Sequence, residues 1–218
     1  MRTVNKLKRC IRSLLPKNLL AKTRFKILKF AKIHTQFFQK SKLKINIGSA
    51  EINNGSEWYP TDKDNLDITR EEDWQNTLSS LRLDNIVAEH VWEHLSLIEA
   101  DLANANCFKY LKKGGLLRIA VPDGYNPNKE YIESIIPGGT GKGAGDHKVL
   151  YDYKIISENL QRAGFETKPL EYWDENGKFH HEDWEDDDGF IIRSRQYDPR
   201  NKNGALKYTS LIIDAIKP

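Results

Sequence analysis

Apolar and polar positions follow the periods of strands and helices along most of the chain. From residue 43 onward, short apolar runs are separated by stretches in which apolar residues recur every three or four positions. The runs predict strands at residues 43–47, 58–61, 67–68, 85–88, 116–121, 165–173 and 208–216, the last two as an antiparallel pair. The intervening stretches predict helices at residues 73–81, 96–111 and 151–162. Strands that alternate with helices indicate an α/β fold with a largely parallel sheet.

Capping residues and glycines mark the ends of these helices. Ser96 is a predicted N-cap, with Glu99 at the capping-box position three residues later. Gly114 and Gly115 are expected to end the same helix, and Gly164 follows the last helix.

Two long segments do not fit the alternation. Residues 122–148 are rich in Gly and Pro, and residues 174–203 are acidic and aromatic. Long loops inside compact domains are usually functional, and ligands of such sheets bind outside the carboxyl ends of the strands. Both segments are therefore expected near a site. Residues 138–145 lack the spacing of a phosphate-binding P-loop, so we interpret them as a flexible loop that closes over the site.

The first 42 residues follow a different pattern. Leu7, Ile11 and Leu14 recur at helical spacing before Pro16, and a second amphipathic stripe follows. This segment carries 13 Lys or Arg and no acidic residue, whereas the rest of the chain has 21 basic and 31 acidic residues, a net charge of −10. We therefore predict a basic arm over residues 1–42 and a separate domain over residues 43–218.

Three interpretations of the arm remain open. Basic amphipathic helices bind anionic membrane surfaces, but the arm could also pack on its own domain as a helical extension. Binding to nucleic acid is the least favoured, because the arm contains no recognised nucleic-acid-binding module. Lys and Arg interrupt every apolar run of the arm, so the sequence predicts no membrane-spanning helix and no signal peptide.

Small residues follow the first predicted strand, and an acid follows the second. Gly48, Ser49 and Ala50 provide a tight turn that lets the backbone approach a ligand. Asp62 ends the second strand, where a carboxylate can accept hydrogen bonds from two ribose hydroxyls. This combination is typical of nucleotide-binding sites, although the sequence contains no G-x-G-x-x-G.

Two longer motifs add specificity. Residues 89–95 read Glu-His-Val-Trp-Glu-His-Leu, and residues 111–123 read Leu-Lys-Lys-Gly-Gly-Leu-Leu-Arg-Ile-Ala-Val-Pro-Asp. With residues 44–50 and 57–62, they resemble the class I S-adenosylmethionine (SAM)-dependent methyltransferases. The branch that they resemble often accompanies surface-polysaccharide glycosyltransferase genes. The resemblance covers residues 43–218 and implies a Rossmann-like fold with a seven-stranded, mostly parallel sheet whose last strand is antiparallel.

The same resemblance implies SAM as cofactor, held at the carboxyl ends of the strands. The residues expected to bind it are Gly48, Ser49, Ala50, Asp62, Asp67, Ile68, Glu89 and His90. The turn departs from the usual Gly-x-Gly-x-Gly, because it reads Gly-Ser-Ala-Glu-Ile and Asn46 replaces the usual acid. Ala50 still permits close approach, but β-branched Ile52 resists positive φ, so this turn is expected to differ locally.

Methyl transfer to a hydroxyl needs an aligned acceptor and a group that takes up its proton. His147, which follows Asp146, and His90, after the fourth strand, are the candidates for catalysis or acceptor binding. The alternative for His147 is a surface histidine beside an N-cap, and for His90 a histidine packed in a turn. Glu93 and His94 are interpreted as residues that cap and orient that turn.

No metal site is predicted. The adjacent His180 and His181 cannot easily share one ion, and no third ligand follows at a recognised spacing. Three arginines could bind a phosphate or carboxylate of the acceptor, or pair with the acids of residues 185–188. They are Arg193, Arg195 and Arg200.

These expectations favour a SAM-dependent methyltransferase that O-methylates a glycan or glycan precursor. It would be cytoplasmic and peripheral on the inner face of the membrane. One alternative is a non-catalytic methyltransferase-fold scaffold in a polysaccharide assembly complex. A nucleic-acid methyltransferase is a second alternative, disfavoured by the acidic domain and by the lack of an Asn/Asp-Pro-Pro-Tyr/Phe motif.

Overall fold

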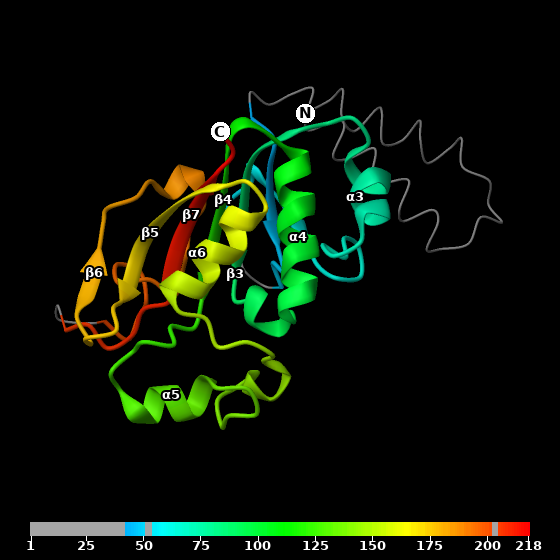
Figure 1. Ribbon diagram of the computed structural model, residues 1–218. Helices are drawn as coiled ribbons and strands as arrows, with labels where there is room; N and C mark the ends of the chain where they lie inside the picture. The colour runs from blue at the N-terminus through cyan, green and yellow to red at the C-terminus, as the bar shows by residue number, and fades with distance from the viewer. Residues whose placement is uncertain (1–41, 51–53, 202–204) are drawn as a thin grey trace.

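One mixed sheet organises the molecule. The computed structural model describes residues 42–50, 54–201 and 205–218, so the predictions for residues 1–41 and for Ile52 lie outside the described residues. The sheet has seven strands in the order β2-β1-β3-β4-β7-β5-β6 (Figure 1). The strands are β1 (Lys44–Ile47), β2 (Trp58–Thr61), β3 (Leu83–Glu89), β4 (Leu111–Val121), β5 (Glu166–Trp173), β6 (Phe179–His181) and β7 (Leu211–Ile216).

The strand directions confirm the predicted Rossmann-like class I methyltransferase fold. β2, β1, β3 and β4 pair in parallel. β7, the last strand of the sequence, is antiparallel and lies between β4 and β5. β6 pairs antiparallel with β5 and forms the outer edge of the sheet. β6 lies within residues 174–203, for which the sequence pattern predicts only a loop.

The strand predicted at residues 67–68 does not form. The backbone N–H of Asp67 donates to the Asp73 carboxylate, and the carbonyl of Ile68 accepts hydrogen bonds from Trp74 Nε1 and Asn106 Nδ2. These side chains satisfy the backbone groups that a neighbouring strand would otherwise use, so the segment remains a fixed turn.

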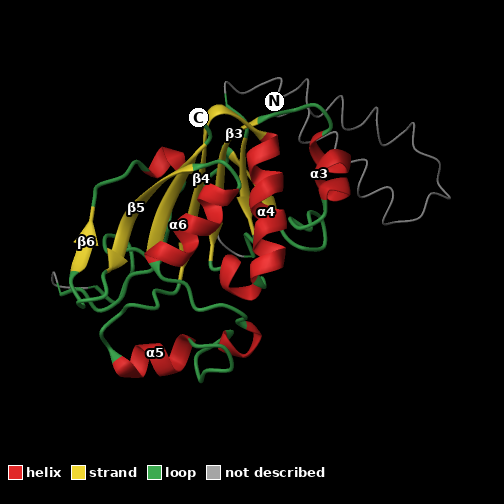
Figure 2. Cartoon of the chain, viewed as in Figure 1, coloured by secondary structure: helices red, strands yellow, loops and turns green. Residues whose placement is uncertain are grey.

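Four α-helices are present among the described residues: α3 (Glu71–Leu78), α4 (Leu97–Tyr110), α5 (Lys129–Ile135) and α6 (Tyr153–Arg162). α4 and α6 lie side by side on one face of the sheet, and α5 lies beyond the edge where β4 ends (Figure 2). None of the described helices combines the length and apolar character needed to cross a membrane.

The predicted helix ends are partly right. The capping box forms, with the Ser96 hydroxyl accepting from the Glu99 backbone and the Glu99 carboxylate accepting from the Ser96 backbone. The prediction that Gly114 and Gly115 end this helix is wrong, because α4 ends at Tyr110 and both glycines lie in β4. Their backbone groups exchange hydrogen bonds with Lys217 beside the end of β7, which extends the sheet.

Alternate residues of the central strands face two separate cores. Ile119 and Val121 point into the larger core, which includes residues of α4 and α6. Ala120 points to the other face, where it packs in a smaller core with Val87 and Ile191. The segment around Ile191 therefore covers the face of the sheet opposite to α4 and α6.

A buried ion pair attaches the segment around Ile191 to the sheet. Arg118 of β4 is 1% exposed, and its guanidinium donates from Nε and Nη2 to the two carboxylate oxygens of Asp214 on β7, at 2.7 and 2.8 Å. The remaining terminal nitrogen donates to the carbonyls of Glu185 and Gly189. The guanidinium also lies over the Trp184 ring, 4.7 Å from its centroid. One cation thus links two strands and the covering segment.

Asp214→Ala should lower the free energy of unfolding by about 3–5 kcal/mol, because it leaves a buried guanidinium without its counter-charge. The matched control is Glu182→Ala, which breaks the pair with Lys168 at a site where both side chains are more than half exposed. That variant should cost at most about 1 kcal/mol. Urea unfolding measures both, and equal losses would contradict the structural role assigned to Arg118.

Candidate functional site

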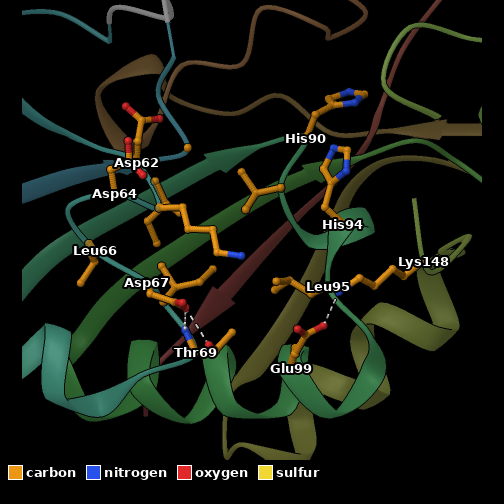
Figure 3. Close-up of a pocket in the computed structure, with 15 residues that line it drawn as sticks. Asp62, Asp64, Leu66, Asp67, Thr69, His90, His94, Leu95, Glu99 and Lys148 are labelled. Carbon is orange, nitrogen blue, oxygen red and sulfur yellow. Dashed lines mark hydrogen bonds and ion pairs between the residues drawn. The ribbon is translucent and has the colours of Figure 1, made fainter. Parts of the chain in front are cut away.

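A cavity of about 490 Å³ lies at the carboxyl ends of β1, β2 and β3. The turn after β1, the loop after β2 and the turn after β3 form its walls, and Lys148 closes one side. Asp62 and Asp64 lie at one end of the cavity, and His90 and His94 lie at the other (Figure 3). The volume is within the range of small-molecule sites, and the position is the one at which open α/β sheets bind ligands.

The turns after β1 and β3 touch each other at Gly48. This residue has φ +61°, and a Cβ atom on it would lie 2.5 Å from Cγ2 of Val91. The residue that follows β3 is also left-handed, since His90 has φ +56°. Only glycine satisfies both the backbone angle and the close contact at position 48.

Ser49 and Ala50 hold Asp62 at the rim of the cavity. The backbone N–H of Ala50 donates to Asp62 Oδ1 at 3.1 Å, and the Ser49 hydroxyl lies 3.5 Å from Oδ2. Ala50 has φ +40°, an uncommon value for a residue with a Cβ atom. Such strain concentrates at functional sites, and the role of this turn in binding a ligand stays a prediction.

Asp67 and Ile68 form part of the cavity wall after β2. Asp67 Oδ1 accepts hydrogen bonds from the backbone and hydroxyl of Thr69, at 3.1 and 2.6 Å. Since the Ile68 carbonyl is also held, this wall is rigid, and both residues line the cavity. The structure therefore brings together five of the predicted cofactor residues around one cavity, namely Gly48, Asp62, Asp67, Ile68 and His90.

Glu89, also predicted to bind the cofactor, has a different environment. It is 5% exposed, and its carboxylate accepts hydrogen bonds from the backbone of Ile192 and Arg193 at 3.0 Å. Glu89 is not among the cavity-lining residues. Its carboxylate is occupied in fastening the covering segment to the end of β3, and a contact between Glu89 and a cofactor stays a prediction.

His90 lines the cavity and is held from both sides. Its Nε2 lies 2.9 Å from the Ser210 hydroxyl, and its Nδ1 lies 3.0 Å from Glu93 Oε1. Neither carboxylate oxygen of Glu93 has a hydrogen-bond partner among the described residues. The negative charge of Glu93 also acts on Tyr151, because burial and this carboxylate raise the pKa of the Tyr151 hydroxyl.

His147 is brought to the same place from a distant part of the sequence. The backbone N–H groups of Lys148 and Val149 donate to the carbonyl of Glu93, which docks this segment beside the β3 turn. The rings of His147 and His94 then meet edge to face, with centroids 5.0 Å apart. A backbone carbonyl orients the ring of His147, whose Nδ1 lies 2.7 Å from the carbonyl oxygen of Ile135.

A charged pair closes the cavity on the side of α4. Lys148 Nζ lies 2.7 Å from Glu99 Oε2, and both residues line the cavity. The hydrogen bond from Lys148, followed by those from Ser96, lowers the pKa of the Glu99 carboxyl to about 2. Glu99 is therefore a carboxylate at any physiological pH and is not a proton donor.

Backbone hydrogen bonds fold the glycine-rich segment onto the end of α5, and its closure over the site stays a prediction. Gly141 donates its backbone N–H to the carbonyl of Ser134, and Gly138 donates to the carbonyl of Ala144. A Cβ atom on Gly141 would lie 2.6 Å from that Ser134 oxygen. Glycine serves here to let the segment fold tightly against the end of α5.

The remaining polar candidates are paired within the protein. Each of the three arginines has an acidic partner, although not within residues 185–188: Arg193 pairs with Glu89, Arg195 with Asp183 and Arg200 with Asp198. His180 bonds to Asp174 through Nε2 at 2.7 Å and stacks on Tyr172. These contacts explain the residues without a ligand.

Comparisons with known proteins add likenesses of fold only. No family model and no curated protein matches the sequence. A SAM-dependent methyltransferase from Archaeoglobus fulgidus matches with 14% identity over 88% of this chain and 93% of its own, at TM-score 0.44. A glycopeptide N-methyltransferase complexed with S-adenosylhomocysteine matches with 9% identity over 87% of each chain, at TM-score 0.45.

Magnesium protoporphyrin IX methyltransferase from Synechocystis PCC 6803 is a third match, with 11% identity over 95% of this chain and 92% of its own, at TM-score 0.41. At such identities and TM-scores these likenesses carry no argument about activity. The fold assignment rests on the strand order and directions.

Gly48→Ala should destabilise the protein by about 2–4 kcal/mol, because left-handed strain and a clash with Val91 add together. Gly114→Ala is the matched control, since Gly114 also has positive φ, +72°, but a Cβ there meets nothing within 4 Å. It should cost only about 1–2 kcal/mol.

Adding Val91→Ala removes the clashing methyl, so the double mutant should recover about 1–3 kcal/mol relative to the sum of the single changes. Chemical unfolding of the parent, the two single variants at positions 48 and 91, and the double mutant gives this coupling energy. Additive losses would contradict the contact between the two turns.

Proposed function

We propose that this protein is a SAM-dependent methyltransferase that methylates an oxygen of its acceptor. The observation that carries the proposal is the cavity at the carboxyl ends of β1, β2 and β3, with a side-chain-free turn at Gly48 and a carboxylate at Asp62. In this arrangement, a nucleoside can approach the backbone closely while its ribose hydroxyls donate to an acid.

The residues present fit this cofactor. Asp62 Oδ2 has only a long contact with Ser49, so the carboxylate retains lone pairs for two ribose hydroxyls. Leu66 and Ile68 provide apolar surface for an adenine ring, and Asp67 lies beside them for its amino group. When bound, SAM supplies a methyl group on a sulfonium sulfur that is an excellent leaving group.

His90 is the proposed general base. Its Nδ1 lies 3.0 Å from Glu93 Oε1 and its Nε2 lies 2.9 Å from the Ser210 hydroxyl. In the tautomer with hydrogen on Nδ1, Nε2 carries the lone pair, and the acceptor hydroxyl would take the place of Ser210 beside it. Nε2 would accept the proton of the acceptor hydroxyl as the oxygen is methylated. His147 is proposed to contact the acceptor, because its ring lies next to His94 at that end of the cavity.

The acceptor that we propose is a hydroxyl of a glycan or glycan precursor. A row of aromatic rings supports it: Tyr125, Tyr153, Tyr172 and His180 contact one another in turn. Asp123 accepts a hydrogen bond from the Trp173 backbone, which places the end of β5 beside the end of β4. Aromatic rings combine apolar faces with polar edges, as does the surface of a sugar.

Association with an anionic membrane surface is the proposed role of residues 1–42. Their 13 Lys or Arg, without any acid, are the support for it. A membrane location at the inner face would place the enzyme near lipid-linked glycan precursors.

Calorimetric titration should show micromolar binding of SAM and S-adenosylhomocysteine at one site. Asp62→Ala should weaken both by at least about 10-fold, because it removes charge-assisted hydrogen bonds to the ribose. Asp183→Ala is the control, as the side chain of Asp183 is 95% exposed and pairs with Arg195. Folded protein that binds neither ligand at millimolar concentration would refute the proposal and favour the scaffold alternative.

His90→Asn should lower kcat by about 100-fold to 10,000-fold, with a much smaller effect on the SAM affinity. Asparagine tolerates the positive φ of position 90 and cannot act as a base. Release of S-adenosylhomocysteine with a panel of oligosaccharides and uronic-acid glycans measures the rate. A variant that turns over as fast as the parent would exclude His90 as the base.

A further inference from the structure

Three metal-ligating side chains converge beside the cavity. Glu93 and His94 belong to a single turn of 3-10 helix, η1 (Trp92–His94), directly after β3, and His147 precedes α6. One ligand atom from each of the three residues can be chosen so that all lie within 4.8 Å of one another. Metal–ligand bonds of 2.0–2.2 Å place ligand atoms roughly 3–3.5 Å apart, so small side-chain rotations would complete a site.

The Glu93 carboxylate is buried without a hydrogen-bond partner among the described residues. The residue is 1% exposed, and neither oxygen accepts a hydrogen bond from the described residues. His90 Nδ1 lies 3.0 Å from Oε1 but is not aligned as a hydrogen-bond donor. A buried carboxylate without donors is strongly disfavoured, and it is normally paired or bound to a metal.

The two histidines offer the complementary atoms. His147 must donate Nδ1–H to the carbonyl of Ile135, so its Nε2 carries a lone pair. A backbone carbonyl that fixes the tautomer in this way is the usual support of a histidine that binds a metal. His94 makes no ring hydrogen bond within the described part of the chain, and its ring touches that of His147.

We propose that Glu93, His94 and His147 bind a divalent first-row transition-metal ion, of which Zn²⁺ is the representative. Two imidazoles and one carboxylate suit such an ion better than Mg²⁺ or Ca²⁺, which prefer oxygen ligands. Three protein ligands leave coordination positions open, as in catalytic rather than structural sites. His94 lines the cavity, so the open positions adjoin it.

The role of the ion rests on the proposed function. At the end of the cavity that holds His90, the ion would bind the acceptor oxygen and lower the pKa of its hydroxyl. Nε2 of His90 would then receive the proton more readily. Binding of the ion itself needs neither SAM nor an acceptor, so the two proposals can fail separately.

The test is a titration of chelator-treated full-length protein with Zn²⁺, without SAM, followed by metal analysis after gel filtration. One ion per chain should bind, and His147→Gln should weaken binding by at least about 10-fold to 100-fold. His180→Gln is the matched control, since His180 is a histidine held by an acid on the β5–β6 hairpin. Its affinity should equal that of the parent.

Binding that is unaffected by His147→Gln, or lost in His180→Gln, would overturn the proposal, as would the absence of stoichiometric binding. If His147→Gln fails to fold, Co²⁺ added to the parent protein decides. An intense visible d–d spectrum of a low-symmetry nitrogen and oxygen site supports the site, and the weak spectrum of hydrated Co²⁺ refutes it. SAM binding with no metal binding would leave only the methyltransferase proposal standing.

Discussion

The contact between the backbone of Gly48 and the side chain of Val91 is the constraint on which the site depends. β1 and β3 are neighbouring parallel strands, so the turns that leave them compete for the same space at the sheet edge. Because position 48 has no side chain, Val91 can lie against it, and His90 can take its left-handed backbone. The cavity lies beside this contact, with Asp62 held by the first turn and the imidazoles carried by the second.

The far end of the site depends on segments that are distant in sequence. The carbonyl of Glu93 accepts hydrogen bonds from the backbone N–H groups of Lys148 and Val149, and these bonds bring His147 next to His94. On the opposite face, Arg118 donates a hydrogen bond to the carbonyl of Gly189, in the segment that covers the sheet. The backbone N–H of Arg193, in the same segment, donates to the carboxylate of Glu89. The sheet is thus closed on both sides while its carboxyl edge stays open to ligands.

The sequence was most informative where local rules decide the structure. Strand and helix periodicity located most elements, and Ser96 and Glu99 formed the predicted cap, because these signals act within a few residues. Residues 67–68 and 114–115 were mispredicted, since distant partners such as Asn106 and Lys217 take their backbone groups. The cluster of Glu93, His94 and His147 was missed for the same reason. Two adjacent residues and a third more than 50 positions away form no recognisable sequence pattern, and the cluster arises only because the segment that carries His147 docks on Glu93.

A crystal structure of the protein with S-adenosylhomocysteine tests the central claim most directly. We expect the nucleoside in the cavity beside Gly48, with its ribose hydroxyls on the Asp62 carboxylate and its adenine against Ile68. Its sulfur should point toward His90. A ligand bound elsewhere on the chain, or a ribose turned away from Asp62, would contradict it.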